Sequence, residues 1–153
     1  MTRFFLVRHG ETEWNRIHRI QGSSDIPLND TGRTQARKAG AVLSRHSFDL
    51  IVASPLSRAM ETATIIARRL RMPLPLPVEA IVERHYGEAE GATREDLVDC
   101  WGIAAGKMAS GVAMELIEEV EKQVAKRHLA DSRLLIGMPP AASEDGGKGK
   151  EEE

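Results

Sequence analysis

Cysteine is almost missing from this sequence, because Cys100 is the only one among 153 residues. A single cysteine excludes a disulfide bond within the chain, and it also excludes a metal site built from a cluster of cysteines. Disulfide bonds are characteristic of oxidising compartments, so their exclusion is consistent with the reducing cytoplasm. We therefore expect a cytoplasmic protein.

The sequence also lacks a charge imbalance and a long hydrophobic run. The formal net charge is −2, from 21 basic and 23 acidic residues, so overall electrostatics favour neither nucleic acid nor a membrane surface as a partner. The apolar run at residues 4–7 is too short for the core of a signal peptide, and no stretch is long enough to span a bilayer. The sequence thus predicts no nucleic-acid partner and no membrane partner.

What the sequence does have is an alternation of apolar runs with helical patterns. The apolar runs predict strands at residues 3–7, 48–53 and 134–136, the first two of them buried, and a further edge strand after the prolines of residues 72–78. Apolar periodicity and capping residues predict helices at residues 29–44, 57–70, 93–99 and 113–127. This alternation indicates an α/β fold, a three-layer α/β/α sandwich with a largely parallel central sheet.

The length and composition fit one domain with a substantial core. We place this domain at residues 1–138 and expect residues 139–153 to be a disordered tail, because they are polar and rich in glycine. Helix 29–44 should turn an apolar stripe inward and pack closely against the sheet at Gly40, where glycine is otherwise unfavourable by about 1 kcal/mol. The residues of this stripe are Ala36, Ala39, Val42 and Leu43.

Polar residues follow the predicted strands. Arg8, His9 and Gly10 follow the first strand, Arg58 comes soon after the second, and Glu83 follows a later apolar pair. Ligands bind at the carboxyl edge of open α/β sheets, and a histidine beside forked cations suits phosphoryl transfer. Taken one at a time, Arg58 is more readily explained as a surface arginine at a helix start, and Glu83 as a solvated acid before a turn.

A series of short motifs runs through the first two thirds of the chain. They are Arg8-His9-Gly10-Glu11-Thr12 with Trp14-Asn15, Gln21-Gly22, Pro27-Leu28-Asn29-Asp30-Thr31-Gly32, Ser54-Pro55-Leu56-Ser57-Arg58-Ala59, Glu61-Thr62-Ala63, Glu83-Arg84-His85-Tyr86-Gly87 and Glu90-Gly91. In this order and at this spacing, residues 3 to about 97 resemble the histidine phosphatase superfamily, which includes the cofactor-dependent phosphoglycerate mutases. The resemblance implies a phosphoglycerate mutase-like fold.

The resemblance also implies a role for each matching residue. His9 would be the nucleophile that becomes phosphohistidine, and Glu83 would give a proton to the leaving oxygen. Arg8 and Arg58 would hold the phosphoryl oxygens. Because these arginines supply positive charge, we expect neither a metal nor another cofactor.

Three further residues are expected to touch the substrate. Asn15 would add an amide donor, although it could also do no more than cap a turn. Gln21 and Gly22 stand where members of the family contact substrate. The expected partner is a small phosphorylated metabolite, and a homodimer is left open.

The resemblance breaks near the C-terminus. The family has a second catalytic histidine after a late strand, but here strand 134–136 is followed by Gly137, Met138 and Pro139, so Met138 stands about where that histidine is expected. A thioether cannot donate a hydrogen bond to a phosphate oxygen. Two explanations stay open: a truncated, frameshifted or alternatively ended product of a phosphatase gene, or a degenerate member that binds phosphate esters without turnover.

We therefore predict a phosphatase that hydrolyses small phosphate monoesters through phospho-His9, weakened by the lack of the second histidine. A phosphoryl transfer of the phosphoglycerate mutase type is the alternative within enzymes. A non-catalytic module that binds phosphate esters is the alternative from another class.

Overall fold

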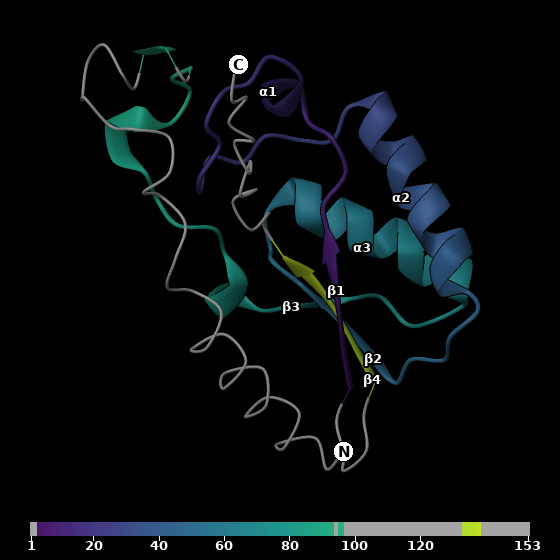
Figure 1. The fold of residues 1–153 in the computed structure, drawn as a ribbon. Coiled ribbons are helices and arrows are strands. Elements are labelled where there is room, and N and C mark those ends of the chain that lie inside the picture. Colours follow the sequence, from purple (N-terminus) through teal and green to yellow (C-terminus); the bar gives the residue numbers. More distant parts are fainter. Residues whose placement is uncertain (1–2, 94, 97–132, 139–153) are drawn as a thin grey trace, which may run out of the picture.

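A computed structural model of the protein describes residues 3–93, 95–96 and 133–138. Its sheet contains the strands β1 (Arg3–Arg8), β2 (Leu50–Ala53), β3 (Leu76–Pro77) and β4 (Arg133–Met138), in the order β1-β4-β2-β3 (Figure 1). All three pairings are parallel. The α/β fold with a parallel sheet is thus confirmed. The predicted helix 113–127 and the predicted tail 139–153 lie outside the described residues.

The register of the strands brings their carboxyl ends together. In the backbone pairing, Arg8 at the end of β1 lies opposite Met138 at the end of β4. On the other side of β4, Ala53 at the end of β2 lies opposite Gly137. Three segments that are far apart in the sequence therefore leave the sheet at the same edge, as the prediction of a shared site requires.

Two long helices are described, one between β1 and β2 in the sequence and one between β2 and β3. Helix α2 (Asp30–Leu43) begins after Asn29, whose side-chain oxygen accepts a hydrogen bond of 2.8 Å from the backbone nitrogen of Gly32. Helix α3 (Ser57–Leu70) has the predicted bounds. The two helices lie side by side in Figure 1.

The core lies between these helices and one face of the sheet. It contains Ile51 and Ala53 of β2 together with three residues of α3, Ala63, Ile66 and Ala67. Side chains from β1 and α2 pack around this cluster, among them Phe5, Val7, Ala39 and Leu43. The odd-numbered residues of β1 thus face the helices, as the alternation of side chains along a strand requires.

Three predictions of packing are wrong. Val42 of the expected stripe is 63% exposed, because the contact surface of α2 faces α3 as well as the sheet. Gly40 accordingly packs against α3, where an added Cβ would lie 3.1 Å from the Cβ of Arg69. Strand β1 is not fully buried: it lies at one edge of the described sheet, and Leu6, which points away from the core, is 58% exposed.

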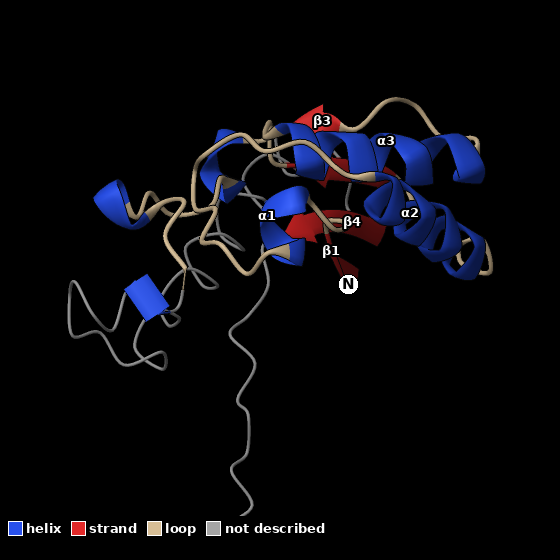
Figure 2. Ribbon diagram, turned by 90° about the horizontal axis from the view of Figure 1, so that it is seen from above, coloured by secondary structure: helices blue, strands red, loops and turns tan. Residues whose placement is uncertain are grey.

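The rest of the described chain is short elements and loops. Helix α1 (Glu13–Arg16) follows β1, and the 3-10 turns η1 (Glu79–Ile81) and η2 (Gly87–Ala89) follow the edge strand β3. Seen from above, the segment with η1 and η2 lies on the opposite side of the molecule from α2 (Figure 2). Among the described residues, no helix is both long enough and apolar enough to cross a membrane.

Candidate active site

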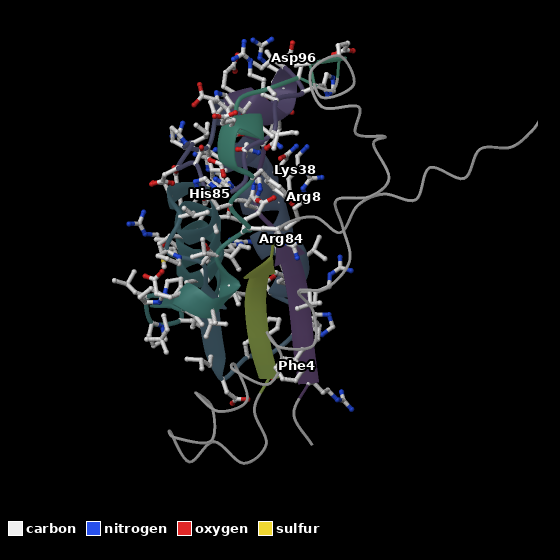
Figure 3. All side chains as sticks on the ribbon, turned by 90° about the vertical axis from the view of Figure 1, so that its left-hand side faces the viewer. Phe4, Arg8, Lys38, Arg84, His85 and Asp96 are labelled. Atoms are coloured by element: carbon white, nitrogen blue, oxygen red, sulfur yellow. The ribbon has the colours of Figure 1, made fainter. Side chains whose placement is uncertain are left out.

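A cavity of about 350 Å³ opens at the carboxyl edge of the sheet. Arg8, His9 and Gly10 reach it from the end of β1, Asn15 from α1 and Thr62 from α3. Figure 3 shows Arg8 at this end of β1 and Phe4 at the other. The remaining residues that line the cavity are Glu11, Gln35, Ala36 and Ala39.

His9 is held in one orientation and one tautomer. Its side chain is nearly buried, and Nδ1 lies 2.7 Å from the carbonyl oxygen of Gly10. Because a carbonyl can only accept a hydrogen bond, Nδ1 carries the proton, and Nε2 of the neutral ring keeps a lone pair. Nε2 is buried and has no hydrogen-bond partner among residues 3–93, 95–96 and 133–138. A buried atom of this kind calls for an explanation, and nucleophilic chemistry is one.

The surroundings keep the His9 ring neutral. Burial and, less strongly, the positive charges of Arg58 and Arg8 together lower its pKa to about 4, against the opposing effect of the Gly10 hydrogen bond. At neutral pH the ring is therefore uncharged, and Nε2 is available as a nucleophile.

The turn after β1 rests directly on the start of α2. A Cβ at Gly10 would lie 2.3 Å from the backbone oxygen of Gly32, and one at Gly32 would lie 2.1 Å from the backbone oxygen of Glu11. No side chain larger than hydrogen fits at either position without moving backbone. These two glycines thus set how closely the turn that carries His9 packs on α2.

Arg58 is a buried residue of the site. It is 1% exposed, which excludes the surface explanation. Its Nη1 donates to the carbonyl oxygen of Ser24 at 2.7 Å, and its Nη2 donates to that of Gly22 at 2.7 Å. Nη2 also donates to Oε2 of Glu83 at 3.0 Å. The arginine is thereby tied to the predicted substrate loop and to the predicted acid.

Glu83 is a partly buried acid whose pKa lies above its ordinary value. Burial raises the pKa of its carboxyl group, although the charge and hydrogen bond of Arg58 and the charge of Arg8 oppose this, and the negative charge of Glu90 adds to it. The explanation of Glu83 as a solvated acid is therefore wrong. A carboxyl group with a raised pKa can give up a proton near neutral pH.

Asn15 and Gln21 both turn their side-chain oxygens toward Thr12. Oδ1 of Asn15 accepts from the backbone nitrogen of Thr12 at 3.0 Å, which closes a capping box on α1. Oε1 of Gln21 lies 2.6 Å from the Thr12 hydroxyl. The interpretation of Asn15 as a capping residue is thus confirmed. It is compatible with the predicted contact to substrate, because the cap uses the side-chain oxygen and leaves the Nδ2 group to donate a hydrogen bond.

Sequence reasoning assigned no role to Thr62 or Glu90. The Thr62 hydroxyl accepts a hydrogen bond of 3.0 Å from the backbone nitrogen of Gly10. The Glu90 carboxylate accepts from the backbone nitrogen of Ser23 at 2.8 Å. Both residues belong to the motifs quoted above, but these two partners lie more than 50 residues away in the sequence, so no local pattern could have identified these contacts.

Two other features of the site bear on its chemistry. Within the described ranges, no group of three or more His, Cys, Asp or Glu side chains is arranged to hold a metal ion. The backbone of Met138 lies beside that of Arg8, so this position of β4 reaches the edge where His9 lies.

Comparison with known proteins places this geometry in a family. The histidine phosphatase superfamily (branch 1) matches residues 4–130. The chain is 49% identical over 96 residues to an uncharacterized phosphatase, PhoE, of Bacillus subtilis, which covers 63% of this chain and 49% of that protein. It is 37% identical over 98 residues to the 2,3-bisphosphoglycerate-dependent phosphoglycerate mutase of Cytophaga hutchinsonii, covering 63% of this chain and 46% of the mutase.

The chain spans about half the length of these two relatives. Its structure matches that of a mycobacterial glucosyl-3-phosphoglycerate phosphatase in complex with VO3, with a TM-score of 0.76 and 28% identity, covering 88% of this chain and 74% of that one. The match of sequence over most of the chain, together with a shared fold, shows that this protein belongs to the histidine phosphatase superfamily.

Proposed function

We propose that this chain hydrolyses small phosphate monoesters in two steps through a phosphohistidine on His9. The observation that carries the proposal is the buried Nε2 of His9, which has no partner in the part of the chain that the structure describes, while Nδ1 is tied to the Gly10 carbonyl. A neutral imidazole nitrogen beside two arginines can attack an anionic phosphoryl group that those arginines hold. The phosphatase relatives and the complex of one of them with VO3 support this chemistry.

In the first step, Nε2 of His9 forms a bond to phosphorus as the bond from phosphorus to the ester oxygen breaks. The proton of the Glu83 carboxyl group goes to the leaving oxygen, which departs as an alcohol. In the second step, water attacks phosphorus, the nitrogen–phosphorus bond breaks, and Glu83 takes a proton from the water. Phosphate is released and the site returns to its starting state.

The arginines and amides hold the phosphoryl group during both steps. Arg58 uses three of its five N–H groups on Ser24, Gly22 and Glu83, which leaves two donors for phosphoryl oxygens. Arg8 is exposed at the rim of the cavity and adds a second cation. The donor ends of Asn15 and Gln21 complete the set. The predicted substrate contact of Gly22 has no support in the packing, because a Cβ at this position would lie 2.3 Å from Oε1 of Glu90 and 2.7 Å from Cδ2 of Tyr86. Positioning and charge neutralisation are what phosphoryl transfer chiefly requires.

Labelling of the nucleophile tests this proposal. Brief reaction with p-nitrophenyl phosphate should leave an acid-labile, base-stable phosphate on the protein, and His9→Ala should abolish both the label and the release of p-nitrophenol. His18→Asn is the matched control, since His18 is an exposed histidine outside the cavity. A label that persists in His9→Ala contradicts the assignment. Phosphate binding without any label would instead support the non-catalytic alternative.

A mutase activity is the second candidate, because a phosphoglycerate mutase is among the relatives. Incubation with 3-phosphoglycerate and 2,3-bisphosphoglycerate would form 2-phosphoglycerate if His9 passes its phosphoryl group to a second substrate. Release of inorganic phosphate alone would favour the phosphatase.

A further inference from the structure

Thr62 connects His9 to Arg58 through hydrogen bonds that involve backbone atoms. It is 4% exposed and lies on α3, one turn after Arg58. Its hydroxyl donates to the carbonyl oxygen of Arg58 at 2.7 Å and accepts from the backbone nitrogen of Gly10 at 3.0 Å. The carbonyl oxygen of Gly10 in turn accepts from Nδ1 of His9 at 2.7 Å.

We propose that Thr62 is a positioning residue for the phosphoryl transfer, which holds the Gly10 backbone so that its carbonyl fixes the His9 ring with Nε2 facing the cavity. This inference rests on the proposed role of His9.

Gly10 makes such a restraint necessary. The close approach to Gly32 demands a residue without a side chain at this position, and glycine has more backbone freedom than any other residue. Rotation about the Gly10 backbone would carry its carbonyl away from Nδ1 and release the ring. The hydrogen bond to Thr62 fixes the peptide plane on one side of the Gly10 Cα. On the other side, the backbone nitrogen of Glu11, which shares a peptide plane with the Gly10 carbonyl, donates to Oε1 of Gln35 at 2.8 Å. Because both planes are held, the carbonyl of Gly10 stays in place.

If the Thr62 hydroxyl served only to stabilise α3, removing it should affect activity no more than removing a similar hydroxyl elsewhere on that helix. Thr64, two residues further along α3, has the same kind of hydroxyl, which donates to the carbonyl oxygen of Met60 at 2.8 Å. Thr62 makes the equivalent bond within the helix and, in addition, the bond to Gly10. Thr64→Val is therefore a matched control, because it removes the helix bond without touching the His9 turn.

The experiment compares Thr62→Val, Thr62→Ser and Thr64→Val with the parent, using p-nitrophenyl phosphate as substrate. We expect Thr62→Val to lower kcat by roughly tenfold or more, the order of loss for a misplaced reacting group, with KM changed less than about twofold. Thr62→Ser keeps the hydroxyl and should retain most of kcat. Thr64→Val should stay within about twofold of the parent in both constants.

A second readout does not depend on activity. In a ¹⁵N spectrum of the histidine rings, the parent and Thr64→Val should show His9 as the Nδ1–H tautomer alone, and Thr62→Val should show a mixture of tautomers. If the parent neither hydrolyses phosphate esters nor labels at His9, the proposed function fails while this spectrum still tests Thr62.

The inference is overturned if folded Thr62→Val matches Thr64→Val in kcat and in the His9 spectrum. If Thr62→Val does not fold, the comparison passes to Thr62→Ser and Thr62→Ala. Equal kcat values for these two would then overturn the inference, and a tenfold advantage for serine would support it.

Discussion

The two sides of the active site are built in different ways. The His9 side consists of residues 8–12 with the start of α2 and the first turns of α3, and backbone packing positions it: a Cβ at Gly10 would lie 2.3 Å from a backbone oxygen. The Glu83 side consists of residues 83–90 with the loop 21–24, and it contains neither a strand nor an α-helix.

Hydrogen bonds to one carboxylate hold the Glu83 side together. Glu90 accepts from the backbone nitrogen of Ser23 at 2.8 Å and from that of Tyr86 at 3.2 Å, and the hydroxyls of Ser23 and Ser24 also donate to it. We therefore expect the His9 side to be sensitive to added volume, and the Glu83 side, with the loop that holds Arg58, to be sensitive to the loss of the Glu90 charge. The following predictions probe this difference.

The largest effect is expected at Met138, the last residue of β4. In the proposed function His9 is the nucleophile, Arg8 and Arg58 hold the phosphoryl group and Glu83 is the acid, while Met138 stands where the resemblance predicts the family's second histidine. Since Met138 pairs with Arg8 in the backbone register, Met138→His with Pro139→Gly should raise turnover of p-nitrophenyl phosphate. The gain should fall within roughly a hundred- to a thousandfold, the range for one preorganised donor.

Met138→Leu with Pro139→Gly is the control for this gain, and His9→Ala in each background is the blank. An unchanged rate in a folded double variant would mean that either the His9 side or the Glu83 side does not have its proposed catalytic role.

Added volume should damage the His9 side much more than the Glu83 side. Gly10→Ala should lower the free energy of unfolding by about 3 kcal/mol, because the new methyl group meets backbone that cannot yield locally. Gly87→Ala should lower it by only about 1 kcal/mol, the cost of its positive φ, since no atom of a described residue beyond its chain neighbours lies within 4 Å of an added Cβ there. Denaturant unfolding measures both values. Equal losses would show that the turn after β1 is not closely packed.

Loss of charge should damage the Glu83 side in a way that depends on pH. Burial opposes ionisation of Glu90, but hydrogen bonds from Ser24, Tyr86 and Ser23 outweigh it and lower its pKa to about 2. A lowered pKa in the folded state stabilises the protein above the ordinary value near 4.5, and this stabilisation is lost as the pH falls toward 2. Glu90→Gln should therefore cost about 1 kcal/mol at pH 7, a modest value because the group is partly solvated.

The difference between parent and Glu90→Gln should shrink as unfolding is measured from pH 5 down to pH 3. Glu88→Gln is the matched control, because Glu88 is an exposed acid of the same segment. A difference that is constant with pH would mean that the amide replaces the carboxylate fully and that the charge has no role.

Local patterns in the sequence were enough to predict the elements that depend on near neighbours. The apolar spacing of residues 57–70 predicted α3 with its bounds, and Asn29 was one of the capping residues expected for α2. The order of strands and helices predicted the parallel sheet. These inferences succeed because helix and strand periodicity and capping operate over a few residues.

The tertiary structure alone decided what surrounds those residues. Arg58 and Glu83 looked like surface groups when taken singly, and only the packing of loop 21–24 and residues 83–90 over them makes one a buried cation and the other an acid with a raised pKa. The same holds for Gly40, which contacts α3 rather than the sheet, and for Thr62, whose partner Gly10 is 52 residues away. Burial and hydrogen bonding between distant segments depend on how the whole chain packs, and no pattern within one element records that.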